Sequence, residues 1–134
     1  MISEFFDVDT SRARTVDITD RIARFVGDAG GDGLLNVFVP HATAGVAIIE
    51  TGSGSEADLI ATLDRMLPHE DIYSHRHGSV GHGADHVMPA LVSPSTTVPV
   101  HAGRMLLGTW QRIVLVDRNA DNPRRVVRLS LLVG

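Results

Sequence analysis

The stretch LLNVFVPHATAGVAIIE, residues 34–50, decides the fold class of this chain. Two nearly continuous apolar runs, Leu34 to Val39 and Gly45 to Glu50, flank a short connection that begins at Pro40. Apolar runs of this length, bounded by turn residues, are typical of strands that are buried on both faces. We therefore expect two strands here, paired as a hairpin through residues 41–44.

Amphipathic helices are predicted on both sides of this stretch. The first follows the capping pair Thr19-Asp20, has apolar residues at helical spacing up to Val26, and leaves through a Gly-rich segment. The second follows the capping residues at 53–55 and carries one apolar stripe between Leu59 and Leu67 before Pro68 ends it.

The C-terminal half reads as further strands. They are expected at Val87–Val92, Thr96–Val100, Arg104–Val116 and Arg124–Val133, with a hairpin turn at Ala102-Gly103 and an additional edge strand near Phe6–Val8. About seven strands joined by short turns, together with two helices on one side, predict an α+β fold built on a mostly antiparallel sheet or sandwich. One domain is expected over residues 1–134. Two helices cannot cover so much apolar sheet, so we also expect a homo-oligomer.

The composition of the chain limits the kinds of partner and of metal site that we expect. The chain has 43% hydrophobic residues but no run of about 18 apolar residues, and its start lacks the pattern of a secretory signal, so a cytoplasmic protein without a membrane anchor is expected. There is no cysteine, so any metal must be held by nitrogen and oxygen ligands. The net charge of −4, the isoelectric point of 5.9 and the aromatic content of 4% argue against nucleic acid as the main partner.

A histidine-rich segment, YSHRHGSVGHGADHV at residues 73–87, carries the strongest chemical signal. It contains four of the seven histidines, His75, His77, His82 and His86, and its glycines argue for a shaped loop. His82 and His86 are four residues apart and therefore share a face in a helix or in an extended segment. Clustered imidazoles bind a cation or move protons, whereas the alternative is a merely solvated loop.

Other polar residues of catalytic type occur where the predicted strands end. His41 is a further metal ligand or a partly buried histidine bonded to backbone. Glu50 is a general base, a ligand, an acceptor that fixes the tautomer of a histidine, or a solvated carboxylate. Arg104, Arg124 and Arg125 could bind phosphate by bidentate contacts. Arg104 is the favoured candidate, whereas the alternative of a surface charge is preferred for Arg124 and Arg125.

The Trp110-Gln111 pair lies within the predicted strand at residues 104–116. Trp110 is expected to pack, and Gln111 to lie on a strand face unless it turns inward.

Several motifs together resemble one known family. They are HATAGVAIIE at 41–50, Tyr73-Ser74-His75, His86, SPSTTVPV at 93–100 and GRMLLGTWQRIVLVD at 103–117. This combination is similar to the YjbQ-like family of secondary thiamine-phosphate synthase enzymes, and the likeness covers nearly the whole chain. The resemblance implies a compact α+β fold, commonly a homotrimer, with a His-lined and often metal-occupied pocket near subunit contacts. It also implies a weak thiamine-phosphate-synthase-like activity, which joins a pyrimidine diphosphate to a thiazole phosphate and releases pyrophosphate.

The family's motif residues carry over to named positions. His41, His75 and His86 match its histidines, Glu50 matches its strand-end glutamate, and Arg104, Trp110 and Gln111 match its Gly-x-Trp-Gln region. This chain departs from the family at 42–44, where Ala-Thr-Ala replaces Thr-Ser-Ala, and in the middle of the loop. There His82 is an additional candidate ligand.

The residues and the resemblance together predict a metal-dependent enzyme that acts on small, phosphorylated molecules. His41, His75 and His86, with His82 as an additional ligand, are expected to hold a divalent metal, and Glu50, Arg104 and Gln111 are the candidate catalytic residues. Three imidazoles suit Zn²⁺ with an open position better than Mg²⁺, which prefers oxygen ligands. The alternatives are a metal-assisted hydrolase and a non-catalytic trimer that binds a metal or a phosphorylated metabolite.

Overall fold

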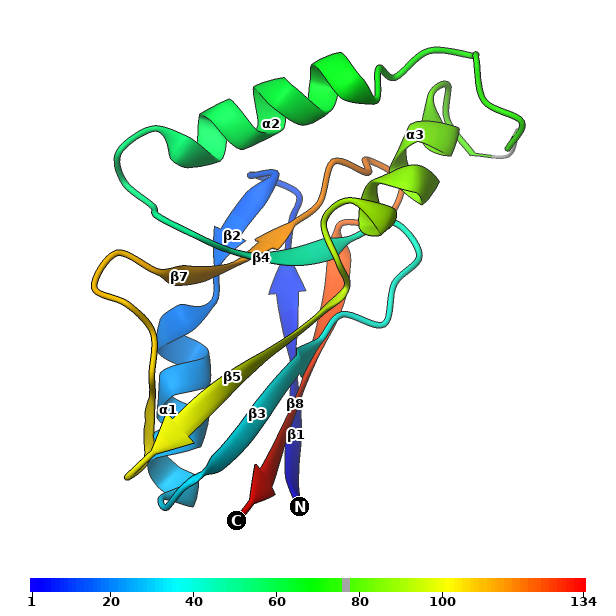
Figure 1. Ribbon diagram of the computed structural model, residues 1–134. Coiled ribbons are helices and arrows are strands. Elements are labelled where there is room, and N and C mark those ends of the chain that lie inside the picture. Colours follow the sequence, from blue (N-terminus) through cyan, green and yellow to red (C-terminus); the bar gives the residue numbers. More distant parts are fainter. Residues whose placement is uncertain (76–77) are drawn as a thin grey trace.

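A computed structural model describes residues 1–75 and 78–134 and shows an α+β fold with two antiparallel sheets (Figure 1). The larger sheet has the strand order β1-β8-β3-β5-β6, and the smaller sheet has the order β2-β7-β4. Their bounds are β1 Ile2–Asp9, β2 Thr15–Asp17, β3 Gly33–Phe38, β4 Gly45–Ile49, β5 Ser95–His101, β6 Arg104–Met105, β7 Arg112–Val116 and β8 Arg124–Val133. The helices are α1 Thr19–Ala29, α2 Ser55–Met66 and α3 His82–Val87, and a 3₁₀ turn at Met88–Ala90 follows α3.

The main core lies between the two sheets and α1. The alternating residues of β3 and β8 that point inward, such as Leu35, Val37 and Leu129, are fully buried there. Helix α1 contributes Ile22 and Val26 to the same cluster. Burying an apolar side chain of this size contributes about 1.5–3 kcal/mol, so this layer supplies most of the driving force for folding.

A second, smaller core holds the candidate site in place. Helix α2 lies across the small sheet, with α3 beside its C-terminal end (Figure 1). Leu63 and Leu67 from the α2 segment pack with Ala84 and Met88 of the α3 segment and with Val116 at the end of β7. The position of α3, and of every side chain on it, therefore depends on α2 and on the C-terminal end of β7.

The expected hairpin over residues 34–50 is wrong. Strand β3 pairs with β5 and β8, whereas β4 pairs with β7 in the other sheet. The connection through residues 41–44 passes from one sheet to the other instead of reversing the chain within one sheet. Both strands are nevertheless present.

The expected strand at Val87–Val92 is also wrong, because Val87 ends α3 and Met88–Ala90 form the 3₁₀ turn. Ala84, Met88 and Val92 recur every four residues and face the second core together, which is a helical repeat. The region Arg104–Val116 is divided into β6 and β7. By contrast, the edge strand β1, the final strand β8 and the turn at Ala102-Gly103, where both residues have positive φ, agree with expectation.

No helix among the described residues is both long and apolar enough to cross a bilayer.

Candidate metal centre

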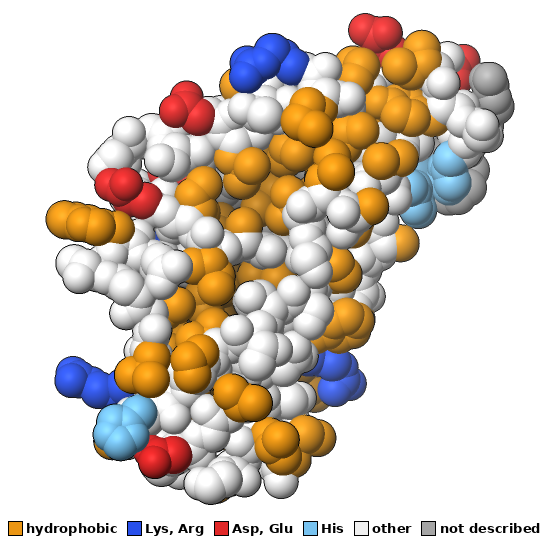
Figure 2. All heavy atoms as spheres, in the orientation of Figure 1, with side chains coloured by type: hydrophobic (Ala, Val, Ile, Leu, Met, Phe, Trp, Pro, Cys, Tyr) orange, Lys and Arg blue, Asp and Glu red, His pale blue; other side chains and the backbone are white. Residues whose placement is uncertain are grey.

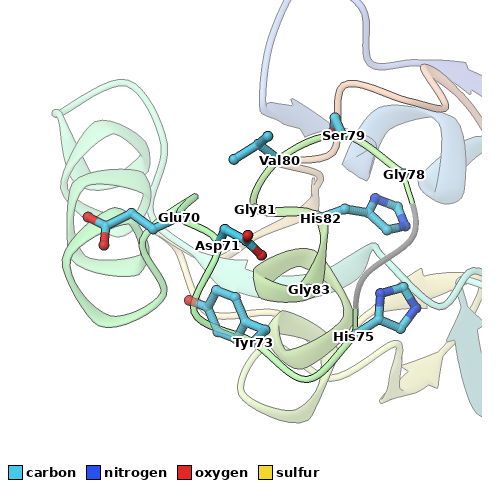
Figure 3. A pocket seen from close by; sticks show the side chains of 10 residues that line it. All are labelled: Glu70, Asp71, Tyr73, His75, Gly78, Ser79, Val80, Gly81, His82 and Gly83. Atoms are coloured by element: carbon cyan, nitrogen blue, oxygen red, sulfur yellow. The ribbon is translucent and has the colours of Figure 1, made fainter.

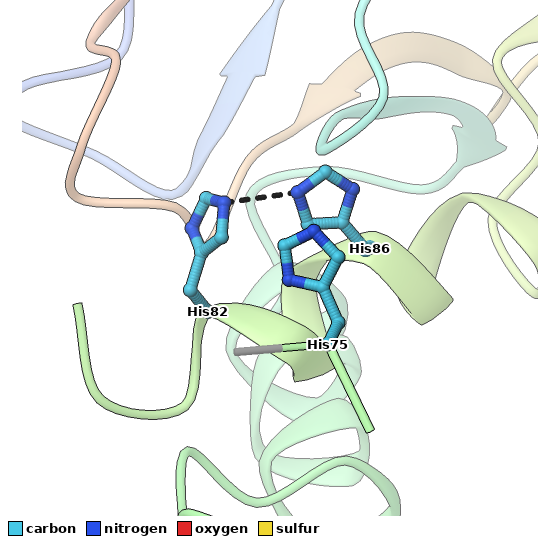
Figure 4. Close-up of side chains that lie close together, drawn as sticks. All are labelled: His75, His82 and His86. Atoms are coloured by element: carbon cyan, nitrogen blue, oxygen red, sulfur yellow. Dashed lines mark hydrogen bonds between the residues drawn. The ribbon is translucent and has the colours of Figure 1, made fainter. Parts of the chain in front are cut away.

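Three histidines converge at the end of the molecule that carries α3. His75, His82 and His86 each offer one ring nitrogen, and these nitrogens lie within 4.8 Å of one another (Figure 4). The Nε2 atoms of His82 and His86 are 2.9 Å apart, and the rings of His75 and His86 are stacked with centroids 4.0 Å apart. Among the described residues, this is the one group of three histidine or carboxylate side chains whose ligand atoms come so close.

Helix α3 brings two of these histidines together. His82 and His86 are one helical turn apart and therefore point to the same side, where His75 meets them from the preceding segment (Figure 4). Gly83 allows this approach, since a Cβ there would lie 2.5 Å from the Cβ of Tyr73. Tyr73 is itself held by its hydroxyl, which donates to the carbonyl oxygen of Pro68 at 2.8 Å.

The ring of His82 has two polar neighbours on its outer side. Its Nδ1 lies 2.9 Å from a carboxylate oxygen of Asp121 and 2.9 Å from the amide nitrogen of Asn119. Asp121 also accepts hydrogen bonds from the backbone N–H and the hydroxyl of Ser79, and the backbone bond is the main reason that the pKa of Asp121 is below its usual value. The turn between β7 and β8 therefore contacts the His82 ring carried by α3.

A second histidine–carboxylate pair lies next to this contact. Nε2 of His69 is 2.6 Å from one oxygen of the buried Asp85, and the other oxygen accepts a hydrogen bond from Asn119 at 2.9 Å. His69, Asn119 and Asp121 were not predicted from the sequence. His69 lies outside any motif, and Asn119 and Asp121 lie far from the histidine loop in the sequence. Only the folded chain places these residues beside the loop.

Asn119 is anchored by a buried ion pair. Its backbone N–H donates to Asp117, and Asp117 is bonded to the guanidinium of Arg125 at 2.7 Å. Arg125 also donates to the hydroxyl of Thr43 at 2.8 Å. Arg125 is 1% exposed, so its expected role as a surface charge is wrong. Its charge is tolerated in the interior because Asp117 neutralises it and several hydrogen bonds satisfy it.

A pocket of about 180 Å³ adjoins His75 and His82 (Figure 3). Its wall includes Glu70, Asp71, Tyr73 and the loop from Gly78 to Gly83. Pockets for drug-sized ligands usually measure about 300–1,000 Å³. Within one chain, this pocket therefore has room for a small molecule or for part of a larger one.

His41 does not join the three histidines in the described structure. Its Nε2 accepts a hydrogen bond from the backbone N–H of Val126 at 2.8 Å, which matches the alternative of a partly buried histidine bonded to backbone. Burial and the nearby Arg125 charge lower the pKa of His41. The expected convergence of His41 with His75 and His86 is therefore wrong for a single chain, and His82 stands in its place.

Glu50 and Gln111 lie side by side, away from the histidines. Ile49 pairs with Arg112, so Glu50 and Gln111 follow at the same end of β4 and β7. Both side chains are exposed, and Gln111 accepts a hydrogen bond from the N–H of Gly108 at 2.7 Å. The α3 segment that carries His82 and His86 packs at the opposite end of β7, beside Val116. Strand β7 has five residues and therefore spans about 17 Å at about 3.4 Å per residue.

Arg104 lies at the far end of the larger sheet. It is exposed on the short strand β6, opposite His101, and α3 is at the other end of the molecule (Figure 1). Trp110, which was expected to pack, is 72% exposed. One chain alone therefore does not bring Arg104, Glu50 and Gln111 to the three histidines. His77 lies outside the described residues.

Comparison with known proteins places these features in a family. A family model described as UPF0047 protein YjbQ-like matches residues 4–133. A UPF0047 protein from Mycobacterium tuberculosis, Rv2556c, is 64% identical over 134 residues and aligns over all of both chains. YugU from Bacillus subtilis is 32% identical over 118 residues, which are 86% of each chain.

Solved structures show the same fold. The hypothetical protein APE1520 from Aeropyrum pernix superposes with a TM-score of 0.89 at 32% identity and covers 100% of both chains. A YjbQ/UPF0047 protein from Clostridium acetobutylicum gives a TM-score of 0.84 at 28% identity, with 96% of this chain and 99% of the other covered. The sequence motifs, the two-sheet fold and these comparisons agree, and the chain belongs to the YjbQ/UPF0047 family.

Proposed function

We propose that this protein holds one divalent metal ion, with zinc favoured, between His75, His82 and His86. The observation that supports this proposal is the approach of three imidazole nitrogens to within 4.8 Å of one another. Three nitrogen ligands leave one position of a tetrahedral zinc site open for water or substrate. Magnesium is disfavoured because it requires oxygen ligands in near-octahedral geometry.

The chemistry that a bound zinc ion would supply is the activation of water or the polarisation of a carbonyl or phosphoryl oxygen. We propose that the protein uses it on a small, phosphorylated molecule that enters the pocket beside His75 and His82. The family resemblance supports a thiamine-phosphate-synthase-like reaction between a pyrimidine diphosphate and a thiazole phosphate. In that proposal Arg104 binds phosphate, and Glu50 and Gln111 orient the substrate.

These catalytic residues can meet the histidines only if neighbouring copies supply them, so the proposal includes a homotrimer. Exposed apolar side chains support an assembly. Leu34 pairs with both Pro99 and Leu132 across the outer face of the larger sheet, where Leu34 is 50% and Leu132 is 59% exposed. Apolar side chains gathered on one surface are typical of subunit contacts.

A second candidate, a non-catalytic binding protein, is favoured by a different observation. The pocket beside the histidines is only about 180 Å³, and neither Arg104 nor Glu50 lies next to it within the chain. Such a protein would use the same metal site to hold one phosphorylated metabolite without turning it over.

Zinc titration of protein purified without a histidine tag tests the metal centre. The wild type should bind one zinc ion per chain, and His86→Ala should lose this binding because two imidazoles remain. The matched control is His101→Ala, which removes an exposed histidine on β5 and should bind zinc like the wild type. Equal zinc binding by all three proteins would contradict the proposal.

The same variant separates the two candidate functions. If the protein is an enzyme, His86→Ala should abolish turnover of the pyrimidine and thiazole substrates along with zinc binding. Turnover that survives in zinc-free His86→Ala would show that the metal centre is not catalytic. Stoichiometric zinc binding without turnover by the wild type would favour the binding protein.

A further inference from the structure

The Nδ1 atom of His82 faces two groups with opposite requirements. The Asp121 carboxylate, 2.9 Å away, can only accept a proton, whereas the Asn119 amide nitrogen, also 2.9 Å away, can only donate one. A neutral imidazole nitrogen satisfies one of these groups and not both. The stronger partner therefore sets which ring nitrogen of His82 carries the proton.

The orientation of Asn119 is fixed by its other contacts. Its carbonyl oxygen accepts the backbone N–H groups of Asp121 and Asn122, so its amide nitrogen must point toward the histidine. That nitrogen also donates to Asp85 at 2.9 Å. The amide group has a second N–H, which faces Nδ1 of His82. Protonation of Nδ1 therefore costs Asn119 one hydrogen bond between neutral groups, while its bond to the Asp85 carboxylate remains.

Asp121 is the stronger partner of His82. A hydrogen bond to a carboxylate is roughly twice as strong as one between neutral groups. The carboxylate is aimed by two donors from Ser79, at 3.2 Å and 3.1 Å. Gly78 permits this close arrangement, because a Cβ there would lie 2.7 Å from the His82 ring and 2.9 Å from the Asp121 carboxylate.

We infer that Asp121 is a positioning residue for the metal centre: it holds the proton of His82 on Nδ1, so that the Nε2 lone pair faces the point shared with His75 and His86. The inference rests on the proposed metal centre for its consequence. Carboxylates behind a histidine ligand fix the tautomer and the ring orientation, and their loss usually costs about 10- to 100-fold in metal affinity. In the metal-free protein, His86 then donates its Nε2 proton to Nε2 of His82 across the 2.9 Å contact.

The tautomer is measured by ¹⁵N NMR of the metal-free protein, above the ordinary pKa of histidine. His82 should carry its proton on Nδ1 in the wild type, and Asp121→Ala should shift the population toward the Nε2-protonated form. Zinc affinity should fall about 10-fold or more in Asp121→Ala. It should fall less in Asp121→Asn, which keeps an oxygen that accepts the Nδ1 proton.

A matched control exists at the opposite end of the molecule. Asp32 accepts a backbone N–H from Ala102 at 2.8 Å and lies 3.0 Å from Nδ1 of His101, so it repeats the contacts of Asp121 without the metal site. Asp32→Ala should leave zinc affinity and the absorption spectrum of the Co²⁺-substituted protein unchanged, whereas Asp121→Ala should alter both.

Two results would overturn the inference. One is a metal-free wild type in which His82 carries its proton on Nε2, and the other is wild-type zinc affinity in a folded Asp121→Ala variant. Failure of the wild type to bind zinc at all would instead overturn the metal centre. The tautomer measurement needs no metal, so the two failures are distinguishable.

Discussion

At the scale of single residues, side chains of the same type have different roles because of their surroundings. His82 and His86 face one another at 2.9 Å, whereas the Nε2 atom of His41 is already used by the N–H of Val126. Arg125 is buried against Asp117, whereas Arg104 is exposed. Residue type alone therefore did not separate a clustered histidine from one that is bonded to the backbone, or a buried arginine from a surface one.

His41 should make folding stability depend on pH. Burial, aided by the Arg125 charge, lowers the pKa of His41, so the folded state favours the neutral ring. The unfolded chain takes up the proton near the ordinary pKa of about 6.5. The stability that neutral His41 contributes is therefore present above that pH and is lost as the pH falls below it.

Urea unfolding of the wild type and of His41→Gln tests this dependence. Glutamine keeps an oxygen that accepts the Val126 N–H but cannot titrate. The free energy of unfolding should fall less in His41→Gln than in the wild type between about pH 7.5 and pH 5.5, on either side of the ordinary pKa. An equal fall in both proteins would show that His41 does not contribute.

At the scale of elements, the local sequence pattern predicted which segments form helices or strands. It predicted less well which strands pair with one another. The apolar stripe of α2 and the alternation of β8 are properties of neighbouring residues, so sequence alone revealed them. The partners of β3 and β4 depend on contacts between distant segments, which the sequence does not show. The run at 87–92 was predicted to be a strand, and this prediction was wrong. Val87 ends helix α3 and Met88–Ala90 form the 3₁₀ turn. Met88 and Val92 pack there with Leu63, Leu67 and Val116 in the second core.

The candidate site shows the same division. The histidine cluster was visible in the sequence because its three histidines lie within residues 75–86. Asn119 and Asp121 were not visible, because they approach His82 only when the turn between β7 and β8 folds over α3. Residues that contact a histidine ring from a distant segment carry no local signature, so only the tertiary structure could identify them.

Helix α3 depends on a glycine at its contact with Tyr73. A Cβ at Gly83 would lie 2.5 Å from the Tyr73 side chain, so Gly83→Ala should displace the helix and destabilise the protein by about 1–3 kcal/mol. Zinc affinity should fall as well, since α3 carries His82 and His86. Chemical denaturation and zinc titration measure the two effects.

The matched control is another helical glycine. Gly27 lies in α1 with nothing within 4 Å of the added Cβ, so Gly27→Ala should stabilise the protein by about 0.5–1 kcal/mol. A Gly83→Ala variant as stable as the wild type would contradict the packing of α3 described here.

At the scale of the whole molecule, the candidate catalytic residues lie away from the histidine cluster. Glu50 and Gln111 lie at one end of the smaller sheet, and Arg104 lies on β6 of the larger sheet. Hydrophobic side chains lie exposed on the face that includes α2, β4 and β5 (Figure 2). Others, such as Leu34 and Leu132, lie on the outer face of the larger sheet. Both the separated polar residues and the exposed apolar ones have a use if copies of the chain pack against one another.

Sedimentation equilibrium tests the proposed trimer. The wild type should have three times the mass of one chain, and Leu34→Asp should shift the equilibrium toward monomer by placing a charge in the contact. Asn36→Asp, a polar position on the same face of β3, is the control for added charge and should weaken the assembly less. A wild type that sediments as a monomer would refute the trimer.

The most direct test of the metal centre is a crystal structure of the zinc-loaded protein with anomalous diffraction measured at the zinc edge. We predict one anomalous peak per chain, about 2.0–2.1 Å from a ring nitrogen of each of His75, His82 and His86. Rings that remain together around no peak, or a zinc ion bound elsewhere on the chain, would contradict the account.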